Sequence, residues 1–267
     1  MAGFLGIGDF TKEGPGVNKN GAKKKRFFAF WEIFWRKKGK LILINVLYLV
    51  CCLPLVTIGP ATAGLMLVLR NMANEQPTFE SSDFFDGFRK NFKQAFPVGL
   101  LFTLLFAVDL FGVWFYSQMA AERAEMKTPA MIAMIVLFGV FFILLFMSFY
   151  VYLLMVTCNL KFKPLMKNAF ILSLVALKTN ILTALSMIGL LALFLLPMFL
   201  YVSLYPLSVI LLVLYGASLP GLAVAFNSYP YITKYVTDPY YEEHADERKT
   251  PTEEAIFEDL TGKDEKN

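Results

Sequence analysis

The sequence predicts an all-α, polytopic integral membrane protein with about six transmembrane helices and short amphipathic cytoplasmic helices. Hydrophobic residues make up 57% of the chain and charged residues only 17%, whereas a soluble domain carries about 25% charged residues. The charges are also segregated, because long uncharged runs occur between residues 41 and 227. Uncharged apolar runs of roughly 20 residues are what a helix needs to cross a hydrocarbon core of about 30 Å.

Composition divides the chain into three parts. Residues 1–40 are polar and basic and contain no secretory signal peptide, so we expect a cytoplasmic N-terminus whose following apolar run acts as an uncleaved signal anchor. Residues 41–229 form the predicted six-helix transmembrane domain. Residues 230–267 are acidic and poor in apolar side chains, which predicts a mobile cytoplasmic tail.

An amphipathic helix is predicted just before the first span, over residues 23–40. Its aromatic residues recur at helical spacing, and basic residues flank them on both sides. Such a helix lies in the membrane interface, where each basic residue contributes about 1 kcal/mol of attraction to anionic lipid. The anionic inner leaflet is therefore the first predicted partner. The aromatic residues are Phe27, Phe30, Trp31, Phe34 and Trp35.

The number of spans depends on one short segment, residues 60–74, which carries Arg70. If it crosses, cytoplasmic segments hold 23 lysines and arginines and outside loops hold 2; if it does not, the split is 12 inside and 13 outside. The positive-inside rule favours the first arrangement, with both termini in the cytoplasm. The six predicted spans are 41–58, 60–74, 96–117, 129–157, 180–203 and 207–227.

The first two predicted spans are joined by "LPLVTIGPATAG", residues 53–64, which we interpret as a helical hairpin. Pro54 ends the first helix, Gly59 supplies the turn conformation, and Pro60 starts the next helix with its preset φ. Thr57 can hydrogen-bond backbone groups freed at the break. Because broken helices often frame ligand sites in transporters, these four residues form a candidate functional hairpin.

A second amphipathic segment, "SSDFFDGFRKNFKQAF", covers residues 81–96. Its phenylalanines recur on one helical face, and its basic side chains lie on the other. One interpretation is a connector that lies along the interface. The alternative is a docking surface for a cytoplasmic or membrane partner. The candidate docking residues are Phe84, Phe88, Arg89, Lys90 and Phe92.

Polar residues inside predicted spans are rare, and we single out Asn45 and Asp109 because such residues usually mark functional sites. The only histidine is His244, and no catalytic, nucleotide-binding or metal-ligand motif is present. The three cysteines lie in or at the ends of apolar runs and resemble buried, inert thiols. We therefore expect no enzyme activity, no catalytic residue, no cofactor, no metal and no nucleic-acid partner.

The order of these segments resembles the YesL family, bacterial membrane proteins classed as domain of unknown function 624. The similarity runs over about residues 27–229, and "PLVTIGPATA" at 54–63 followed by the aromatic-basic segment at 84–96 is its most specific part. The resemblance implies about six helices, residence in the bacterial plasma membrane and no established activity. It also implies an accessory role in carbohydrate import, because members are often encoded beside such systems.

Three functional hypotheses stay open at this point. The first is an accessory component of carbohydrate (ABC-type) uptake, with ABC transporter subunits as partners. The second is a stand-alone small-solute transporter or channel, favoured by the broken helix at residues 54–60. The third is an oligomeric membrane scaffold, in which small residues permit close packing between copies of the chain. Those small residues are Gly59, Ala61, Ala63 and Gly64.

Overall fold

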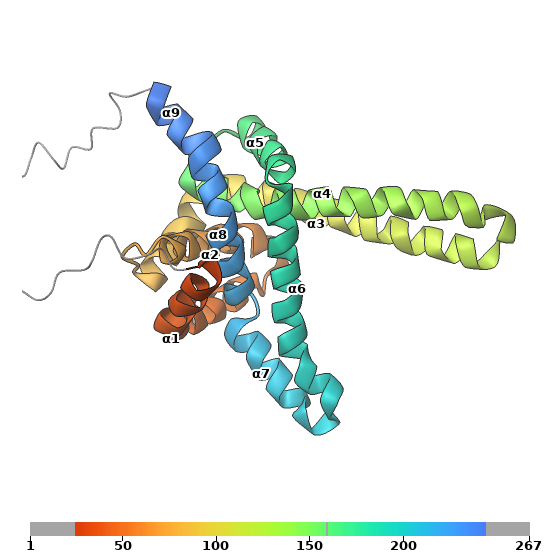
Figure 1. The fold of residues 1–267 in the computed structure, drawn as a ribbon, viewed down its shortest axis with the longest axis horizontal. Coiled ribbons are helices and arrows are strands. Elements are labelled where there is room, and N and C mark those ends of the chain that lie inside the picture. The colour runs from red at the N-terminus through yellow and green to blue at the C-terminus, as the bar shows by residue number, and fades with distance from the viewer. Residues whose placement is uncertain (1–24, 159, 244–267) are drawn as a thin grey trace, which may run out of the picture.

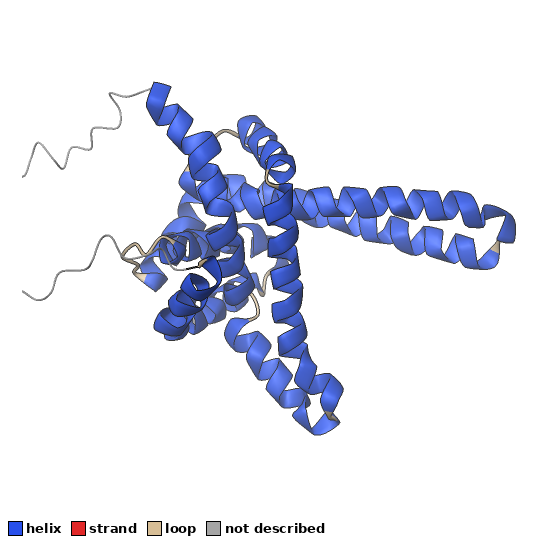
Figure 2. Cartoon of the chain, viewed as in Figure 1, coloured by secondary structure: helices blue, strands red, loops and turns tan. Residues whose placement is uncertain are grey.

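The computed structural model describes residues 25–158 and 160–243, and within these ranges every regular element is a helix (Figure 2). The α-helices are α1 (Arg26–Cys52), α2 (Ile58–Ala73), α3 (Glu80–Glu122), α4 (Lys127–Thr157), α5 (Phe162–Val175), α6 (Leu177–Leu200), α7 (Tyr205–Tyr215), α8 (Ser218–Ile232) and α9 (Asp238–Glu243). Single turns η1 (Leu55–Thr57), η2 (Ala124–Met126) and η3 (Val202–Leu204) and the π-helical η4 (Thr233–Thr237) join some of them. Residues 1–24 and 244–267, which include His244 and most of the predicted tail, lie outside the described residues.

Helix α2 is the centre of the fold. It packs most extensively against α3 and also contacts α8, α1 and α4. Of its most apolar stretch, 56% is buried, compared with 11% in α4 and 22% in α3 and in α6. Helix α2 thus lies at the centre of a core that also includes α8 and the C-terminal third of α4, while the most apolar stretches of the longer helices are largely exposed.

Two helical hairpins project from this core as arms that run in different directions (Figure 1). The first arm is made of the C-terminal part of α3 and the N-terminal part of α4, joined by η2. The second is made of the C-terminal part of α6 and α7, joined by η3. In the first arm, over residues 103–145, only Asp109 and Ala130 are buried. Apolar side chains exposed over such lengths need lipid or another protein around them.

Four helical segments are long and apolar enough to cross a membrane: Leu55–Ala73, Glu80–Glu122, Ala124–Thr157 and Leu177–Leu200. A fifth is possible if Tyr205–Tyr215 and Ser218–Glu243, bent by 46° at their junction, count as one span. The short segment with Arg70 is thus one of the candidate spans. The last predicted span, 207–227, is broken between α7 and α8.

The first predicted span, 41–58, is not among these segments. In the structure the predicted interfacial helix and this span are one helix, α1, which ends at Cys52 just before Pro54. Pro54 has no N–H to continue the helical ladder, and proline disfavours helical backbone in the residue before it. The part of α1 after its last lysine, residues 41–52, covers roughly 18 Å at about 1.5 Å per residue. That is shorter than the ~30 Å hydrocarbon core.

Two further predicted boundaries fall inside continuous helices. The amphipathic segment at 81–96 and the following span form the single helix α3, which continues through Pro97. At the other end of the chain, α8, η4 and α9 carry helix from Ser218 to Glu243, across the predicted border between the membrane domain and the tail.

Candidate functional site

The predicted functional hairpin is a turn between α1 and α2, but its residues have different roles from those expected. Pro54 is exposed and precedes η1, and the Thr57 hydroxyl donates to the carbonyl oxygens of Cys51 and Pro54 (2.9 Å to the latter). The turn is made by η1, so the prediction that Gly59 supplies it is wrong. Gly59 is the second residue of α2, and Pro60 lies in the same first turn, where a missing N–H is tolerated.

Gly59 instead allows α2 and α3 to touch backbone to backbone. A Cβ built on Gly59 would collide with the carbonyl oxygen of Ala95 and lie 3.0 Å from the Cα of Gly99. From the other side, a Cβ on Gly99 would lie 2.6 Å from the Cα of Gly59. Small residues at such a crossing let membrane helices approach closely and pack well.

The same two helices repeat this contact about one and a half turns further along α2. A Cβ on Gly64 would lie 2.5 Å from the carbonyl oxygen of Phe84, and a Cβ on Gly87 would lie 2.9 Å from the Cα of Gly64. The small residues predicted to join separate copies of the chain are thus largely buried within it. Gly59, Ala61, Ala63 and Gly64 are all buried.

Asn45, on α1, is completely buried and caps the break between α7 and α8. Its side-chain oxygen accepts hydrogen bonds from the backbone N–H groups of Ala217 (2.9 Å) and Ser218 (2.8 Å), and its amide nitrogen donates to the carbonyl oxygen of Val213 (2.7 Å). These are groups that a broken helix leaves without partners. In a membrane, where no water can satisfy them, one amide side chain stabilises both ends of the break.

Asp109 lies in the middle of the α3–α4 arm and is 96% buried. Neighbouring contacts place it at the α4 face of α3, because the rings of Phe106 and Phe141 are 5.6 Å apart on one side and Gly112 packs on Leu137 on the other. Neither carboxyl oxygen has a hydrogen-bond partner among the described residues. A buried carboxyl group without hydrogen bonds destabilises the fold, and the packing of α3 on α4 does not explain why an aspartate occurs at this position.

We predict that Asp109→Leu leaves folding stability unchanged or raises it by about 1–3 kcal/mol, because an apolar side chain of similar shape removes an unsatisfied buried polar group. Thermal unfolding of the purified protein in detergent measures this effect. A clear loss of stability would contradict it and would reveal a polar partner for Asp109. If the variant is stable but cannot replace the parent protein in the cell, the carboxyl group has a functional role.

The candidate docking residues do not form one surface. Phe84 is fully buried at the Gly64 contact and is unavailable to a partner, whereas Arg89, Lys90 and Phe92 are exposed. The Lys90 amine pairs with Asp86 at 2.9 Å, and the Arg89 guanidinium lies 5.7 Å from the ring centroid of Phe85. Phe92 packs against Phe88 and Phe96 in a partly exposed aromatic row. A reduced docking face of Phe88, Arg89, Lys90 and Phe92 therefore remains at the surface.

The basic end of the predicted interfacial helix contacts the turn between α2 and α3. Arg36 pairs with Glu75 at 2.5 Å, Lys40 pairs with Glu80, and Lys37 donates to the carbonyl oxygen of Met72 at 3.3 Å. Burial, together with the charges of Arg36 and Lys40, lowers the pKa of Lys37 below its ordinary value. These residues therefore connect α1 to the turn between α2 and α3.

Two polar residues that the sequence did not single out as sites also join helix ends. The Arg70 guanidinium, half-buried on α2, donates to the carbonyl oxygen of Val156 (2.7 Å) at the end of α4, where a positive charge also complements the helix dipole. Asn180, at the start of α6, accepts from the Tyr150 hydroxyl (2.6 Å) and donates to the Ser173 carbonyl (2.9 Å). In the sequence, Arg70 bears only on the number of spans, and no neighbouring motif indicates a role for Asn180.

The long apolar helices, the exposed arms and the buried capping side chains together indicate a membrane-embedded protein that is all-helical over the part of the chain that the structure describes. Residues 41–113 match the model of the family described as "Protein of unknown function, DUF624", which confirms the resemblance to the domain of unknown function 624 family over this stretch. The matched stretch contains the 53–64 turn and both glycine contacts between α2 and α3. No curated protein and no solved structure matches the chain.

Proposed function

We propose that this protein is an accessory component of a carbohydrate (ABC-type) uptake system in the bacterial plasma membrane. The observation that carries the accessory role is the α3–α4 arm, whose two long apolar helices have no packing partner but each other among the described residues. The carbohydrate part of the proposal rests on the YesL-family resemblance. In this role the arm lies alongside the transmembrane helices of a transporter subunit, while the glycine-packed core keeps the arm in position.

The arm offers a surface suited to another transmembrane helix. Ile135 and Val136 of α4 are more than 60% exposed. Gly139, one turn further, has no neighbouring atom within 4 Å of a built Cβ, so a partner helix can approach α4 closely there. Association of helices in lipid depends on such packing and not on a hydrophobic driving force.

Two observations speak against the alternative functions. A solute transporter would use the free groups of a broken helix for its ligand. At the break between α1 and α2 the Thr57 hydroxyl occupies the carbonyl groups of Cys51 and Pro54, and at the α7–α8 break Asn45 occupies groups on both sides. A scaffold held together by small residues would expose them, but those of α2 are buried, and its two glycines pack on α3. An accessory role that uses the exposed arm conflicts with neither observation.

Photo-crosslinking in living cells tests the accessory role. A photoreactive amino acid at Ile135 is expected to give adducts with a membrane subunit of a carbohydrate uptake system, identified by mass spectrometry. The matched control is the same amino acid at Leu137, two residues away, whose side chain packs on Gly112 inside the arm. Adducts at Ile135 with lipid alone, or only with a second copy of this chain, would contradict the proposal.

For topology we propose six spans with both termini in the cytoplasm. The charge distribution supports this arrangement. The short apolar part of α1 crosses only if the bilayer is locally thin or if neighbouring helices shield its end. At that end, Leu53 and Leu55 are both more than 75% exposed, so within the described residues no helix shields them. A reporter fused after Asn74 is expected in the cytoplasm, and a signal on the outside would exclude the six-span topology.

A further inference from the structure

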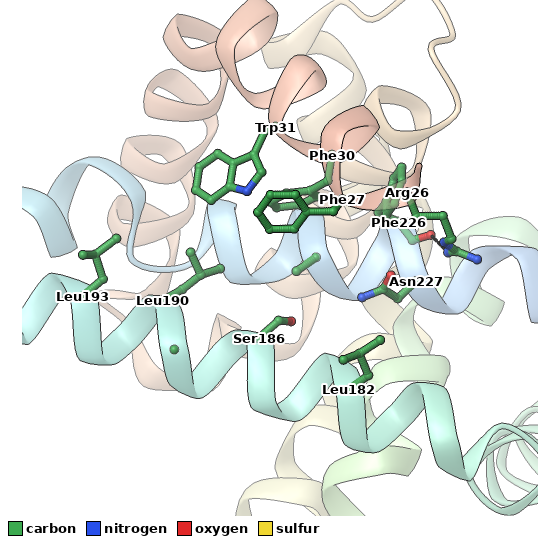
Figure 3. Close-up of a pocket in the computed structure, with 12 residues that line it drawn as sticks. Arg26, Phe27, Phe30, Trp31, Leu182, Ser186, Leu190, Leu193, Phe226 and Asn227 are labelled. Atoms are coloured by element: carbon green, nitrogen blue, oxygen red, sulfur yellow. Dashed lines mark hydrogen bonds between the residues drawn. The ribbon is translucent and has the colours of Figure 1, made fainter. Parts of the chain in front are cut away.

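An apolar cavity of about 500 Å³ lies between the first turns of α1, the middle of α6 and the C-terminal half of α8 (Figure 3). Its volume is in the roughly 300–1,000 Å³ range of small-molecule sites. Phe27, Leu182 and Leu193 line it and are each more than half exposed, so the cavity is open to the side. In a membrane-embedded chain, this opening faces lipid.

The cavity has one polar end and one apolar end. Arg26 and Asn227 lie together at one end, Leu190 and Leu193 lie at the other, and Ser186 lies between them (Figure 3). The remaining wall is aromatic, from Phe27, Phe30 and Trp31. Leucines of α6 line the cavity from Leu182 at the polar end to Leu193 at the other, so a single charged end adjoins a largely aliphatic wall. This is the polarity pattern of an amphiphile.

The charge at the polar end is held in a defined position. The Arg26 guanidinium donates to the carbonyl oxygen of Phe226 at 3.0 Å, and its central carbon lies 5.3 Å from the Phe226 ring centroid. One of its five N–H donors is used in that bond, and guanidinium groups bind phosphate oxygens through the geometry of the others. Lys25 precedes it in the chain and adds a second positive charge nearby.

We propose that this cavity is a binding site for an anionic phospholipid, with the lipid phosphate at Arg26 and one acyl chain along α6 toward Leu193. Charge complementarity selects an anionic head group, and the apolar end selects the chain. The position also fits a membrane, because Arg26 opens a basic helix of the kind that lies in the interface, where anionic head groups are concentrated. This site is separate from the α3–α4 arm and does not depend on the transporter partner.

Trp31 provides the measurement, since it lines the cavity. A protein carrying Trp35→Phe and Trp114→Phe keeps Trp31 as its one remaining tryptophan of three. In phosphatidylcholine nanodiscs, added phosphatidylglycerol with brominated acyl chains is expected to quench Trp31 saturably at low mole fraction. Brominated phosphatidylcholine is expected to quench it only in proportion to its amount.

Two variants test the two ends of the site separately. Arg26→Gln is expected to reduce the preference for the anionic lipid about five-fold, the equivalent of the ~1 kcal/mol that one basic residue contributes at a membrane surface. Gly189→Leu fills the apolar end without a collision, because a Cβ there meets no atom within 4 Å, and it is expected to lower quenching by both lipids. Gly139→Leu is the matched control, since it is equally unobstructed but lies outside the cavity.

Three results would overturn the proposal. Equal quenching by both lipids in the parent protein would mean that bulk lipid fills the cavity without selection. An unchanged preference for the anionic lipid in Arg26→Gln would show that Arg26 does not bind the lipid phosphate. Quenching that becomes strong only after residues 1–22 are deleted would identify the chain's own N-terminal segment as the occupant. Helical circular dichroism of each variant shows that altered quenching does not arise from unfolding.

Discussion

Asn45→Ala is expected to give a large loss of stability, because Asn45 is fully buried and holds three backbone groups at the break between α7 and α8. The change leaves the N–H groups of Ala217 and Ser218 and the carbonyl of Val213 without their partner. Each unsatisfied buried group costs about 1–3 kcal/mol, so we expect a total of about 3 kcal/mol or more. Thermal unfolding in detergent, followed by size-exclusion chromatography of the surviving fraction, measures this loss.

The matched control is Asn91→Ala, because the Asn91 amide donates only to the Gly87 carbonyl in its own helix. Its expected effect is within about 0.5 kcal/mol, as for most substitutions away from a buried network. Asn45→Asp keeps an acceptor for Ala217 and Ser218 but places a carboxyl group beside the Val213 carbonyl at a fully buried position, so it is expected to be less stable than the parent. Equal stability of Asn45→Ala and Asn91→Ala would show that the break does not depend on this cap.

Gly59→Leu is the second change with a large expected effect. Even the Cβ would collide with the backbone oxygen of Ala95, and backbone cannot move aside as a flexible side chain can. Overpacking usually costs about 1–3 kcal/mol, and we expect leucine here to exceed that range because α3 backbone fills the space beyond the Cβ. The measured result is loss of folded, monodisperse protein after extraction into mild detergent.

Gly139→Leu, also a helical glycine but one with open space around it, controls for the chemical change itself. Its expected effect is neutral or stabilising, since leucine favours helix by roughly 0.5–1 kcal/mol over glycine. Gly59→Ala and Gly99→Ala are expected to be destabilising as well, because both face the same contact. A Gly59→Ala protein as stable as the parent would mean that α2 and α3 are not in backbone contact.

Local signals in the sequence predicted the helices well and their ends less well. Pro54 ends the first helix, as its missing N–H requires, and five of the six predicted spans coincide with long or broken apolar helices. The sequence predicts the amphipathic segments at 23–40 and 81–96 as separate helices, but both are continuous with the spans that follow. Pro97 lies at the predicted boundary between the second amphipathic segment and its span, but it does not end the helix, since α3 continues through it.

The roles of individual residues could not be predicted in the same way. Asn45 meets groups about 170 positions away in the chain, and Arg70 meets a helix end 86 positions away. Gly59 was assigned to a turn because glycine favours turns, whereas its lack of a Cβ serves a helix contact with Gly99. Phe84 was placed on an exposed aromatic face because helical spacing shows which residues share a face but not what covers it.

By itself the sequence determined that this is an all-helical membrane protein and where most of its helices lie. Those properties follow from the lengths of apolar runs and from the few residues that interrupt a helix. Only the tertiary structure decided which faces form the core, which form the two arms, and which polar side chains stabilise helix ends. The physical reason is that a membrane helix is apolar toward lipid and toward protein alike, so hydropathy cannot distinguish a packed face from an exposed one.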